Sequence, residues 1–286
     1  MKNKKYGFIG QGFVGGNLAD NYEERGYNVV RYDVERYKGN KEKIRACDVV
    51  FIAVPTPTVN EMFDSSILFD VVKLCRDGAV VVIKSTVPPE VLSKLSIEFN
   101  NLTVFHSPEF LDENTAKEDT DFPKKNIIGV KDKTNPDLVN LAVMVMNTLP
   151  SSNFSNVVSY KESAMIKYIH NAYFYVKNVF FNMSYDLCNE MGADWDEIIK
   201  AILSEPRIDE IHTRPIDKGG RGAGGHCLIK DFSVFSGMFR NFFIGEGEGD
   251  SRCDVITAIE SMNNIYLNDS GKDLEILNEV YVWTKK

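Results

Sequence analysis

The sequence predicts an α/β protein: a parallel-sheet domain comes first, and an all-helical domain with one long central helix follows. Near the N-terminus an apolar strand runs into a glycine-rich turn and then into a helical pattern. Several continuous Val/Ile runs follow, which are typical of parallel strands buried on both faces. Later, residues 161–191 form one helical pattern without glycine or proline. Length favours two domains, and we expect them at residues 1–158 and 159–286.

The composition indicates an ordinary globular protein and argues against several other classes. Of the 286 residues, 43% are hydrophobic and 26% are charged. A net charge of −8 argues against general nucleic-acid binding. No apolar run is long enough for a signal peptide or a membrane span, so we expect a soluble, cytoplasmic protein. The five cysteines form no CxxC pair and the four histidines lack metal spacing, so neither disulfides nor a metal site is expected.

The glycine-rich turn has the pattern of a dinucleotide site. A strand at residues 6–9 leads into Gly10, Gly12 and Gly15, and a helical pattern continues to about residue 26. The G-x-G-x-x-G spacing allows a tight turn and lets a pyrophosphate approach the helix N-terminus. This context predicts a Rossmann-type domain that binds a dinucleotide.

The second strand indicates which dinucleotide is bound. Residues 27–32 are expected to form this strand, and Asp33 follows it directly. A carboxylate at this place accepts the adenosine ribose hydroxyls and repels a 2′-phosphate. We therefore expect NAD as the cofactor.

Two further strands end in loops that contain prolines. Residues 48–54 and 79–83 are apolar, and the carboxyl ends of such strands line the ligand crevice of a doubly wound sheet. Pro55, Thr56 and Thr86 should therefore face the cofactor. For Thr56, a local hydrogen bond within the turn explains the residue equally well.

The segment after the next strand is ambiguous. Residues 102–105 form a strand, after which Ser107 could cap a helix that begins at Pro108. Glu109 would then be a first-turn carboxylate that complements the helix dipole, or a base at the crevice. A strand, a helix and a strand complete this half, at residues 126–130, 135–147 and 156–159.

The long helical run contains a narrow polar stripe. Lys167, Asn171, Asn178 and Asn182 fall within roughly 60° of arc at about 100° per residue. Their neighbours are mostly apolar, so this helix should be buried, and buried amides and ammonium groups need partners. Either the stripe is an interhelical hydrogen-bond ladder or Lys167 and Asn171 line a substrate site. We favour the second interpretation.

Residues 219–231 read GGRGAGGHCLIKD and contain more glycine than a helix or strand tolerates. Apolar periodicity resumes after Cys227, which places this cysteine near a helix start, where the helix dipole favours a thiolate. The loop is also locally basic, as suits a small anionic ligand, although chance would explain this too. A flexible loop with a buried cysteine and a loop that carries a nucleophile are both compatible with the pattern.

Taken together, the motifs resemble the nucleotide-sugar 6-dehydrogenases, of the UDP-glucose and GDP-mannose dehydrogenase type. The resemblance runs from Gly10 to about Asn268. It rests on GQGFVG, VPTPT, KSTVPP, SPEFLDENTA, the KxxxN of Lys167 and Asn171, NEMGAD, PRI and GAGGHCLIKD. It implies NAD-dependent oxidation of a sugar C6 alcohol to the carboxylate in two hydride transfers, most simply on a UDP-glucose-like substrate for polysaccharide biosynthesis.

The resemblance also implies a role for each residue at the reacting carbon. Cys227 would trap the aldehyde as a thiohemiacetal and become a thioester after the second transfer. Lys167 would stabilise oxyanions with Asn171 beside it. Glu109 would be the base for hydrolysis, with Thr86 and Asp231 holding water.

Further binding residues follow from the resemblance. Besides the residues already named, the cofactor would contact Phe13, Val14, Glu113 and Lys230. The substrate would contact Glu109, Phe110, Leu111, Glu113, Lys167, Asn171, Arg207, Gly224 and Gly225. In the family this arginine reaches across a subunit interface, so we expect a homodimer through the long helix.

The sequence departs from the family pattern in two places. The segment between Arg207 and Cys227 lacks the family's usual aromatic-leucine-proline sugar loop. The sequence ends soon after a helix expected at residues 255–267, where the family continues into a third, nucleotide-sugar-binding domain, so we expect that domain to be absent. Residues 245–250, GEGEGD, are expected to form an exposed loop.

Two other functions compete with this one. A two-electron dehydrogenase of the 3-hydroxy-acid type would explain Lys167 and Asn171 but would leave Cys227 and Glu109 without a role. A non-catalytic NAD-binding protein would not be expected to keep all of these residues.

Overall fold

The computed structural model describes residues 1, 3–243 and 250–281, and its chain forms two compact units. The first unit contains Met1–Thr56 and Asp64–Lys167, and the second contains Pro57–Phe63 and Tyr168–Lys286. Most of the loop expected at residues 245–250 lies outside the described residues. Its last residue, Asp250, caps the next helix by accepting a hydrogen bond from the Arg252 amide.

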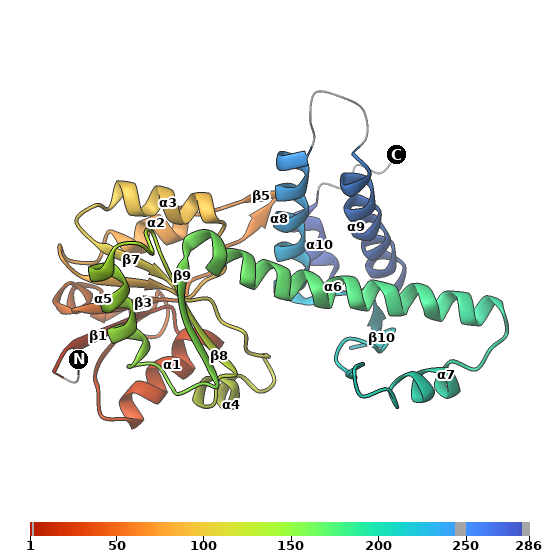
Figure 1. Cartoon of the computed structure of the whole chain (residues 1–286), viewed down its shortest axis with the longest axis horizontal. Helices are drawn as coiled ribbons and strands as arrows, with labels where there is room; N and C mark the ends of the chain where they lie inside the picture. The colour runs from red at the N-terminus through yellow and green to blue at the C-terminus, as the bar shows by residue number, and fades with distance from the viewer. Residues whose placement is uncertain (2, 244–249, 282–286) are drawn as a thin grey trace. The chain divides into compact units, whose positions relative to one another are not determined.

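The first unit is built on a seven-stranded sheet with the strand order β2-β1-β3-β6-β7-β8-β9 (Figure 1). The order reverses between β1 and β3, which makes the topological switch point typical of doubly wound folds. The strands are β1 (Lys5–Ile9), β2 (Asn28–Tyr32), β3 (Val49–Ile52), β6 (Val80–Ile83), β7 (Thr103–His106), β8 (Lys125–Val130) and β9 (Phe154–Ser159).

One strand pair differs from the expected all-parallel sheet. β8 is antiparallel to β7, through the pair His106 and Gly129, whereas all other neighbours in the sheet are parallel. The short helix α4 (Ala116–Asp121), which lies between them in sequence, packs against α1 (Phe13–Glu24). Because a parallel return needs a full crossover beside the sheet and α4 does not provide one, the chain re-enters the sheet in the opposite direction.

Helices cover the sheet of the first unit, and aromatic side chains fill the space beneath them. Tyr6, Phe8, Tyr22, Phe51 and Phe105 are at most 1% exposed. The ring centroids of Phe8 and Tyr22 lie 5.2 Å apart in an edge-to-face arrangement, which aromatic pairs prefer. The remaining helices of this unit are the 3₁₀ segment Lys38–Ala46, α2 (Ser66–Val72), α3 (Pro89–Glu98) and α5 (Pro136–Met146).

The second unit is mainly helical. The 31-residue helix α6 begins in the first unit and runs through the second, and Tyr175 on α6 stacks on Phe232 with ring centroids 3.8 Å apart. The elements are α6 (Tyr160–Glu190), α7 (Trp195–Ile202), α8 (Gly225–Phe243), α9 (Ser251–Ser270), α10 (Leu274–Val280) and the hairpins β4 (Thr58–Val59) with β5 (Met62–Phe63) and β10 (Ile216–Asp217) with β11 (Gly220–Arg221).

The fold class is confirmed: a mostly parallel sheet with helices is followed by a helical region with one long helix. The helices expected at residues 135–147 and 161–191 correspond to α5 and α6, and the helix expected at 255–267 is the central part of α9. Helices α2, α3, α7 and α10 were not expected, since each is at most ten residues long and has no motif to mark it. None of the described helices is long and apolar enough to cross a membrane.

Candidate functional site

The turn after β1 has the geometry of a dinucleotide-binding loop. Gly10 has φ +86°, and a Cβ there would lie 2.1 Å from the carbonyl oxygen of Ala53. A Cβ on Gly15 would lie 2.0 Å from the Gly10 oxygen, whereas one on Gly12 would meet no atom within 4 Å. Two glycines are therefore required by close packing, and the middle one faces open space at the N-terminus of α1, where a pyrophosphate binds.

Asp33 lies immediately after β2 and orders the turn. Its Oδ2 accepts a hydrogen bond from the Gln11 amide at 3.1 Å, and its Oδ1 accepts one from the Glu35 amide at 2.9 Å. Hydrogen bonds from backbone amides, that of Glu35 foremost, lower the pKa of Asp33. The residue is thus a carboxylate at neutral pH and keeps lone pairs for ribose hydroxyls.

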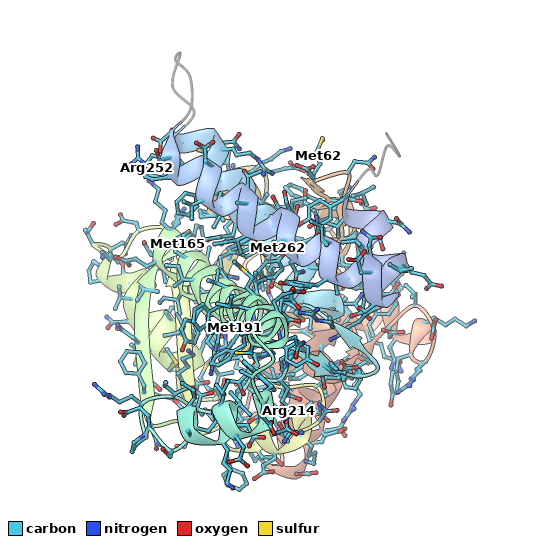
Figure 2. All side chains as sticks on the ribbon, turned by 90° about the vertical axis from the view of Figure 1, so that its right-hand side faces the viewer. Met62, Met165, Met191, Arg214, Arg252 and Met262 are labelled. Carbon is cyan, nitrogen blue, oxygen red and sulfur yellow. The ribbon has the colours of Figure 1, made fainter. Side chains whose placement is uncertain are left out.

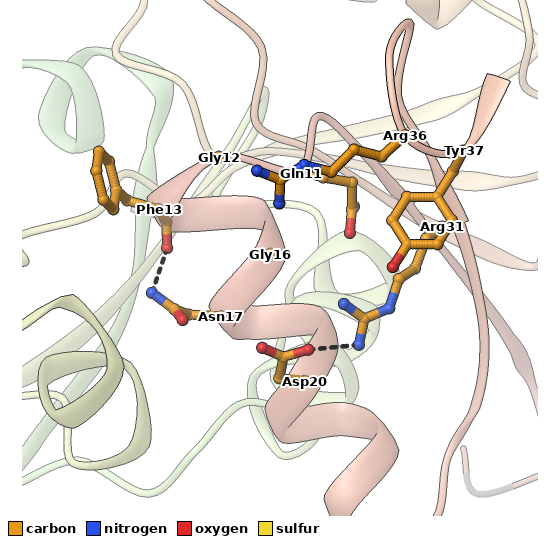
Figure 3. Close-up of a pocket in the computed structure, with 9 residues that line it drawn as sticks. All are labelled: Gln11, Gly12, Phe13, Gly16, Asn17, Asp20, Arg31, Arg36 and Tyr37. Carbon is orange, nitrogen blue, oxygen red and sulfur yellow. Dashed lines mark hydrogen bonds and ion pairs between the residues drawn. The ribbon is translucent and has the colours of Figure 1, made fainter.

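Two pockets lie beside the glycine turn in the first unit, and Asp33 lines one of them. One, of about 520 Å³, is lined by the turn after β1, by residues 33–36 and by Ala53, Val54, Pro55, Lys84 and Ser85. The other, of about 570 Å³, lies along α1. Figure 3 shows Gln11, Arg36 and Tyr37 around it, with Arg31 bonded to Asp20. The buried Oε1 of Gln11 has no hydrogen-bond partner among the described residues. Open space above Gly12 and an unsatisfied polar atom beside the turn fit a bound dinucleotide.

Some of the residues expected near the cofactor line one of these pockets, and others do not. Phe13 and Val14 line the smaller pocket together with Pro55. The Thr56 hydroxyl donates to the Thr86 carbonyl oxygen at 3.1 Å, which is the local bond considered for it. Thr86 is half-buried.

The structure contradicts the helix expected at residue 107. Residues 107–115 contain no helix, and α4 begins only at Ala116. Ser107 does not cap a helix, since its hydroxyl accepts a 3.1 Å hydrogen bond from Lys84 Nζ. Glu109 therefore has no helix dipole to complement, and that explanation of the carboxylate is wrong.

Lys84 is a residue that the sequence reasoning missed. Its ammonium group forms an ion pair with Glu109, and the two side chains are 4% and 23% exposed. Its neighbour His106 is fully buried, and burial lowers the pKa of His106 to about 3, so the histidine is neutral. Lys84 is thus the cation that holds the Glu109 carboxylate. Its position in the KSTVPP motif, directly after β6, could have indicated a place in the site.

A second group of side chains surrounds Phe110. Lys125 Nζ lies 4.0 Å from the ring centroid and Lys167 Nζ lies 5.4 Å from it. Burial and the nearby Lys167 charge lower the pKa of Lys125. Leu111 is half-buried and Glu113 is exposed. Lys125, at the start of β8, was also not anticipated.

The polar stripe of α6 is buried, as predicted, and within the second unit it serves two purposes. Asn171 Nδ2 donates to Asp231 Oδ2 at 2.6 Å, and Lys230 Nζ lies 2.5 Å from Asp231 Oδ1. Asp231 is 3% exposed. This chain of polar groups joins α6 to the first two turns of α8.

The other half of the stripe holds an arginine. Asn182 Nδ2 donates to Asn178 Oδ1 at 3.0 Å, and Arg221 Nε donates to Asn182 Oδ1 at 3.0 Å. Arg221 also pairs with Asp186 at 2.7 Å. This half is structural, but it is not the interhelical ladder that was the alternative interpretation, since its bonds lie within α6 and between α6 and β11.

Cys227 is the third residue of α8 and is exposed, so its predicted place near a helix start is confirmed and burial of this cysteine is excluded. By contrast, burial raises the pKa of Cys47 to about 11 and that of Cys75 to about 12, and both thiols are inert at neutral pH. Gly224 and Gly225 lie three and two residues before Cys227, and the Gly225 amide donates to Asp273 Oδ2 at 2.8 Å.

Arg207 lies apart from these residues in sequence and is exposed. Its guanidinium group bonds Glu205 at 2.8 and 2.9 Å, and its side chain is 86% exposed. Among the described residues no cluster of His, Cys, Asp and Glu could hold a metal ion.

The glycine turn, the acid after β2 and the switch-point pocket define a dinucleotide-binding protein of the Rossmann class. Comparison with known families makes this specific. The NAD-binding domain model of the UDP-glucose/GDP-mannose dehydrogenase family matches residues 35–144, and the central-domain model of the same family matches residues 161–264. The chain belongs to the UDP-glucose/GDP-mannose dehydrogenase family, and NAD is its cofactor.

Similar proteins agree with this assignment. UDP-glucose 6-dehydrogenase of Rickettsia prowazekii is 27% identical over 78% of this chain and 50% of its own length. The enzyme of the same name from Streptococcus pneumoniae is 25% identical over 83% of this chain and 69% of its own. The chain thus spans about half the length of several of the curated relatives it matches.

Solved structures share the fold. A UDP-D-ManNAc dehydrogenase from Pyrococcus horikoshii superposes with a TM-score of 0.75 at 21% identity, covering 94% of this chain and 72% of that one. A UDP-glucose dehydrogenase from Pyrobaculum islandicum gives a TM-score of 0.75 at 23% identity, covering 92% and 68%.

Proposed function

We propose that this chain carries the NAD-dependent oxidation of a nucleotide-sugar C6 alcohol to the carboxylate, through a covalent intermediate on Cys227. The observation that carries the proposal is the start of α8. There an exposed thiol precedes by four residues a buried aspartate, Asp231, that is bonded to Asn171. A two-electron dehydrogenase needs no nucleophilic thiol, so this arrangement favours the four-electron reaction.

Bound NAD supplies a hydride acceptor, and two molecules are used per substrate. In the proposed sequence the Cys227 sulfur bonds to C6 of the first product, an aldehyde, and the resulting alkoxide takes a proton to give a thiohemiacetal. After the second two-electron oxidation the thioester carbon is attacked by water. The C–S bond breaks, the thiol is restored and the sugar acid leaves as a carboxylate.

The remaining residues would assist these steps. Lys167 and Asn171 would stabilise the oxygen that carries developing charge. Glu109, held by Lys84, would accept the proton of the attacking water, and Thr86 and Asp231 would orient that water. We assign Gly10, Gly12, Phe13, Val14, Gly15, Asp33, Pro55, Thr56, Glu113 and Lys230 to the cofactor.

The substrate class follows from the family, since the curated relatives are named UDP-glucose 6-dehydrogenases. We propose a UDP-glucose-like nucleotide sugar, used for polysaccharide synthesis in the cytoplasm. Phe110, Leu111, Glu113, Arg207, Gly224 and Gly225 would contribute to its binding. The first unit would be the NAD-binding domain and the second the helical domain.

We also propose a homodimer through α6, because this helix exposes a continuous apolar face. The exposed apolar side chains fall within roughly 80° of arc, on the side of the helix opposite the buried polar stripe. An exposed apolar stripe of this kind marks a protein interface. Figure 2 labels Met191, the residue that directly follows the C-terminal end of this helix. The stripe consists of Ile169, Tyr173, Phe180, Met183, Leu187 and Met191, which are 49–73% exposed.

The test counts NADH formed per molecule of substrate across a panel of UDP-, GDP- and dTDP-sugars. The wild-type chain should form two NADH per sugar acid. Cys227→Ser should form no acid, because an alkoxide is a far poorer leaving group than a thiolate. Cys188→Ser, which changes a partly buried cysteine outside the loop, should turn over normally.

Other outcomes would contradict the proposal. One NADH per substrate would favour a two-electron dehydrogenase of the 3-hydroxy-acid type. Unchanged acid formation by Cys227→Ser would exclude the covalent intermediate. Tight NAD binding without NADH from any sugar would favour a non-catalytic NAD-binding protein.

A further inference from the structure

The loop that leads to Cys227 is fastened by residues of α9 and by those that follow it. The fully buried Asn263 bonds both backbone polar groups of Ala223: its Oδ1 accepts from the Ala223 amide at 2.6 Å and its Nδ2 donates to the Ala223 oxygen at 3.1 Å. Ser270 Oγ accepts from the Arg221 amide at 2.8 Å. The conformation of the loop is therefore set by a segment more than thirty residues later in the chain.

Two consecutive charged residues between α9 and α10 complete this attachment. Lys272 Nζ donates to the Gly222 oxygen at 3.1 Å, and Asp273 Oδ2 accepts from the Gly225 amide at 2.8 Å. A Cβ on Gly224 would lie only 2.0 Å from Asp273 Oδ2. The absence of a side chain at residue 224 thus leaves the space that the Asp273 carboxylate occupies.

The side chain of Asp273 forms a hydrogen bond with α8 and does not cap its own helix, α10. Asp273 stands at the N-cap position of α10 with φ 52° and ψ 33°, and it makes no side-chain cap there. A left-handed backbone is unfavourable for most residues other than glycine, although aspartate and asparagine adopt it more readily than others. The hydrogen bond to Gly225 is the contact that this conformation allows.

The position of the carboxylate matters because Gly225 is the first residue of α8 and Cys227 is the third. The first amides of a helix are its positive end and bind anions. The Asp273 carboxylate already uses one of these amides, and it places its charge at a residue two positions before Cys227.

We propose that Asp273 is a positioning residue for Cys227, which holds the start of α8 and gives the thiol a negative electrostatic surrounding. This inference rests on the proposed role of Cys227 as the nucleophile. It assigns oxyanion stabilisation to the polar stripe of α6, since an anion at the start of α8 would meet the Asp273 carboxylate.

The test measures the alkylation rate of Cys227 in the full chain, without substrate or cofactor, by mass spectrometry of the peptide that contains it. The rate with neutral iodoacetamide depends on the accessibility and reactivity of the thiol. The rate with anionic iodoacetate depends in addition on the electrostatic potential around the thiol. Asp273→Asn keeps an acceptor for the Gly225 amide and tolerates the left-handed backbone. It should raise the iodoacetate-to-iodoacetamide rate ratio about two- to fivefold.

Two further variants separate charge from structure. Asp269→Asn removes the same charge from an exposed position on α9 and should leave the ratio unchanged. Asp273→Ala removes the acceptor, so hydrogen exchange at the Gly225 amide should accelerate, whereas Asp273→Asn should retain its protection.

An unchanged rate ratio in Asp273→Asn, or an equal rise in Asp269→Asn, would overturn the inference. So would an unaltered Gly225 exchange rate in Asp273→Ala. Alkylation needs no turnover, so this test can be read even if the chain proves inactive. Inactivity would contradict the proposed function and would leave the result of this test valid. An unchanged ratio alongside a Cys227→Ser variant that forms no acid would defeat this inference alone.

Discussion

At the scale of single residues, the most consequential contact is the ion pair between Lys84 and Glu109. Lys84 is almost fully buried, and a buried ammonium group requires a partner. Its neighbour His106 is neutral and cannot replace it. Lys84 also lines the pocket beside the glycine turn, so one cation borders the cofactor site and holds the proposed base.

Lys84→Met should therefore lower the rate of acid formation at least about tenfold and destabilise the first unit by about 3 kcal/mol, because it leaves a carboxylate facing a buried site without its cation. Lys84→Arg keeps the charge and should retain most of the activity. Steady-state kinetics and urea unfolding measure the two effects. Wild-type turnover in Lys84→Met would show that Glu109 does not depend on this contact.

At the scale of elements, α6 has an inverted pattern: its polar stripe is buried and its apolar stripe is exposed. Asn171 bonds Asp231 and Asn182 bonds Arg221, which joins α6 to α8 and to the hairpin of β10 and β11. The apolar face has no such cover within the described chain. A partner copy would remove it from water.

Leu187→Glu should weaken the proposed dimer at least about a hundredfold, because it places a charge within the apolar stripe. Asn189→Glu adds the same charge to an exposed position of α6 outside the stripe and should have no such effect. Light scattering across a concentration series measures both. A Leu187→Glu chain that dimerises like the wild type would place the interface elsewhere.

At the scale of the whole molecule, the chain forms two units with separate cores. The core of the first is built on the sheet, around Tyr6, Phe8 and Phe51. The second unit has one core around Tyr175 and Phe232 and another around Ile229, Leu267 and Leu277. Every residue of the glycine turn and of the pocket beside it belongs to the first unit.

NAD should therefore stabilise the first unit selectively. At one hundred times its dissociation constant it adds about 2.7 kcal/mol, which for a unit of this size raises the unfolding midpoint by roughly 5–10 °C. Calorimetry should show two transitions, of which only one moves. NADP should shift that transition less, because the Asp33 carboxylate repels the 2′-phosphate. A shift confined to the other transition would contradict this division.

The sequence by itself determined the features that short-range patterns encode. Glycine spacing and the acid after the second strand predicted the dinucleotide turn, and the absence of glycine and proline over residues 161–191 predicted α6. The apolar period after Cys227 predicted its place at a helix start. Each of these rests on residues within one or two turns of each other, whose conformational preferences are local.

Only the tertiary structure decided the contacts between distant residues. The helix expected at Ser107 does not form, because Ser107 and Glu109 are held by Lys84, more than twenty residues earlier. β8 reverses its direction because α4 packs on α1. Asp273 reaches the Gly225 amide across 48 positions of sequence. No local pattern encodes such pairs, because they form only when separate elements are packed together and buried charges must find partners.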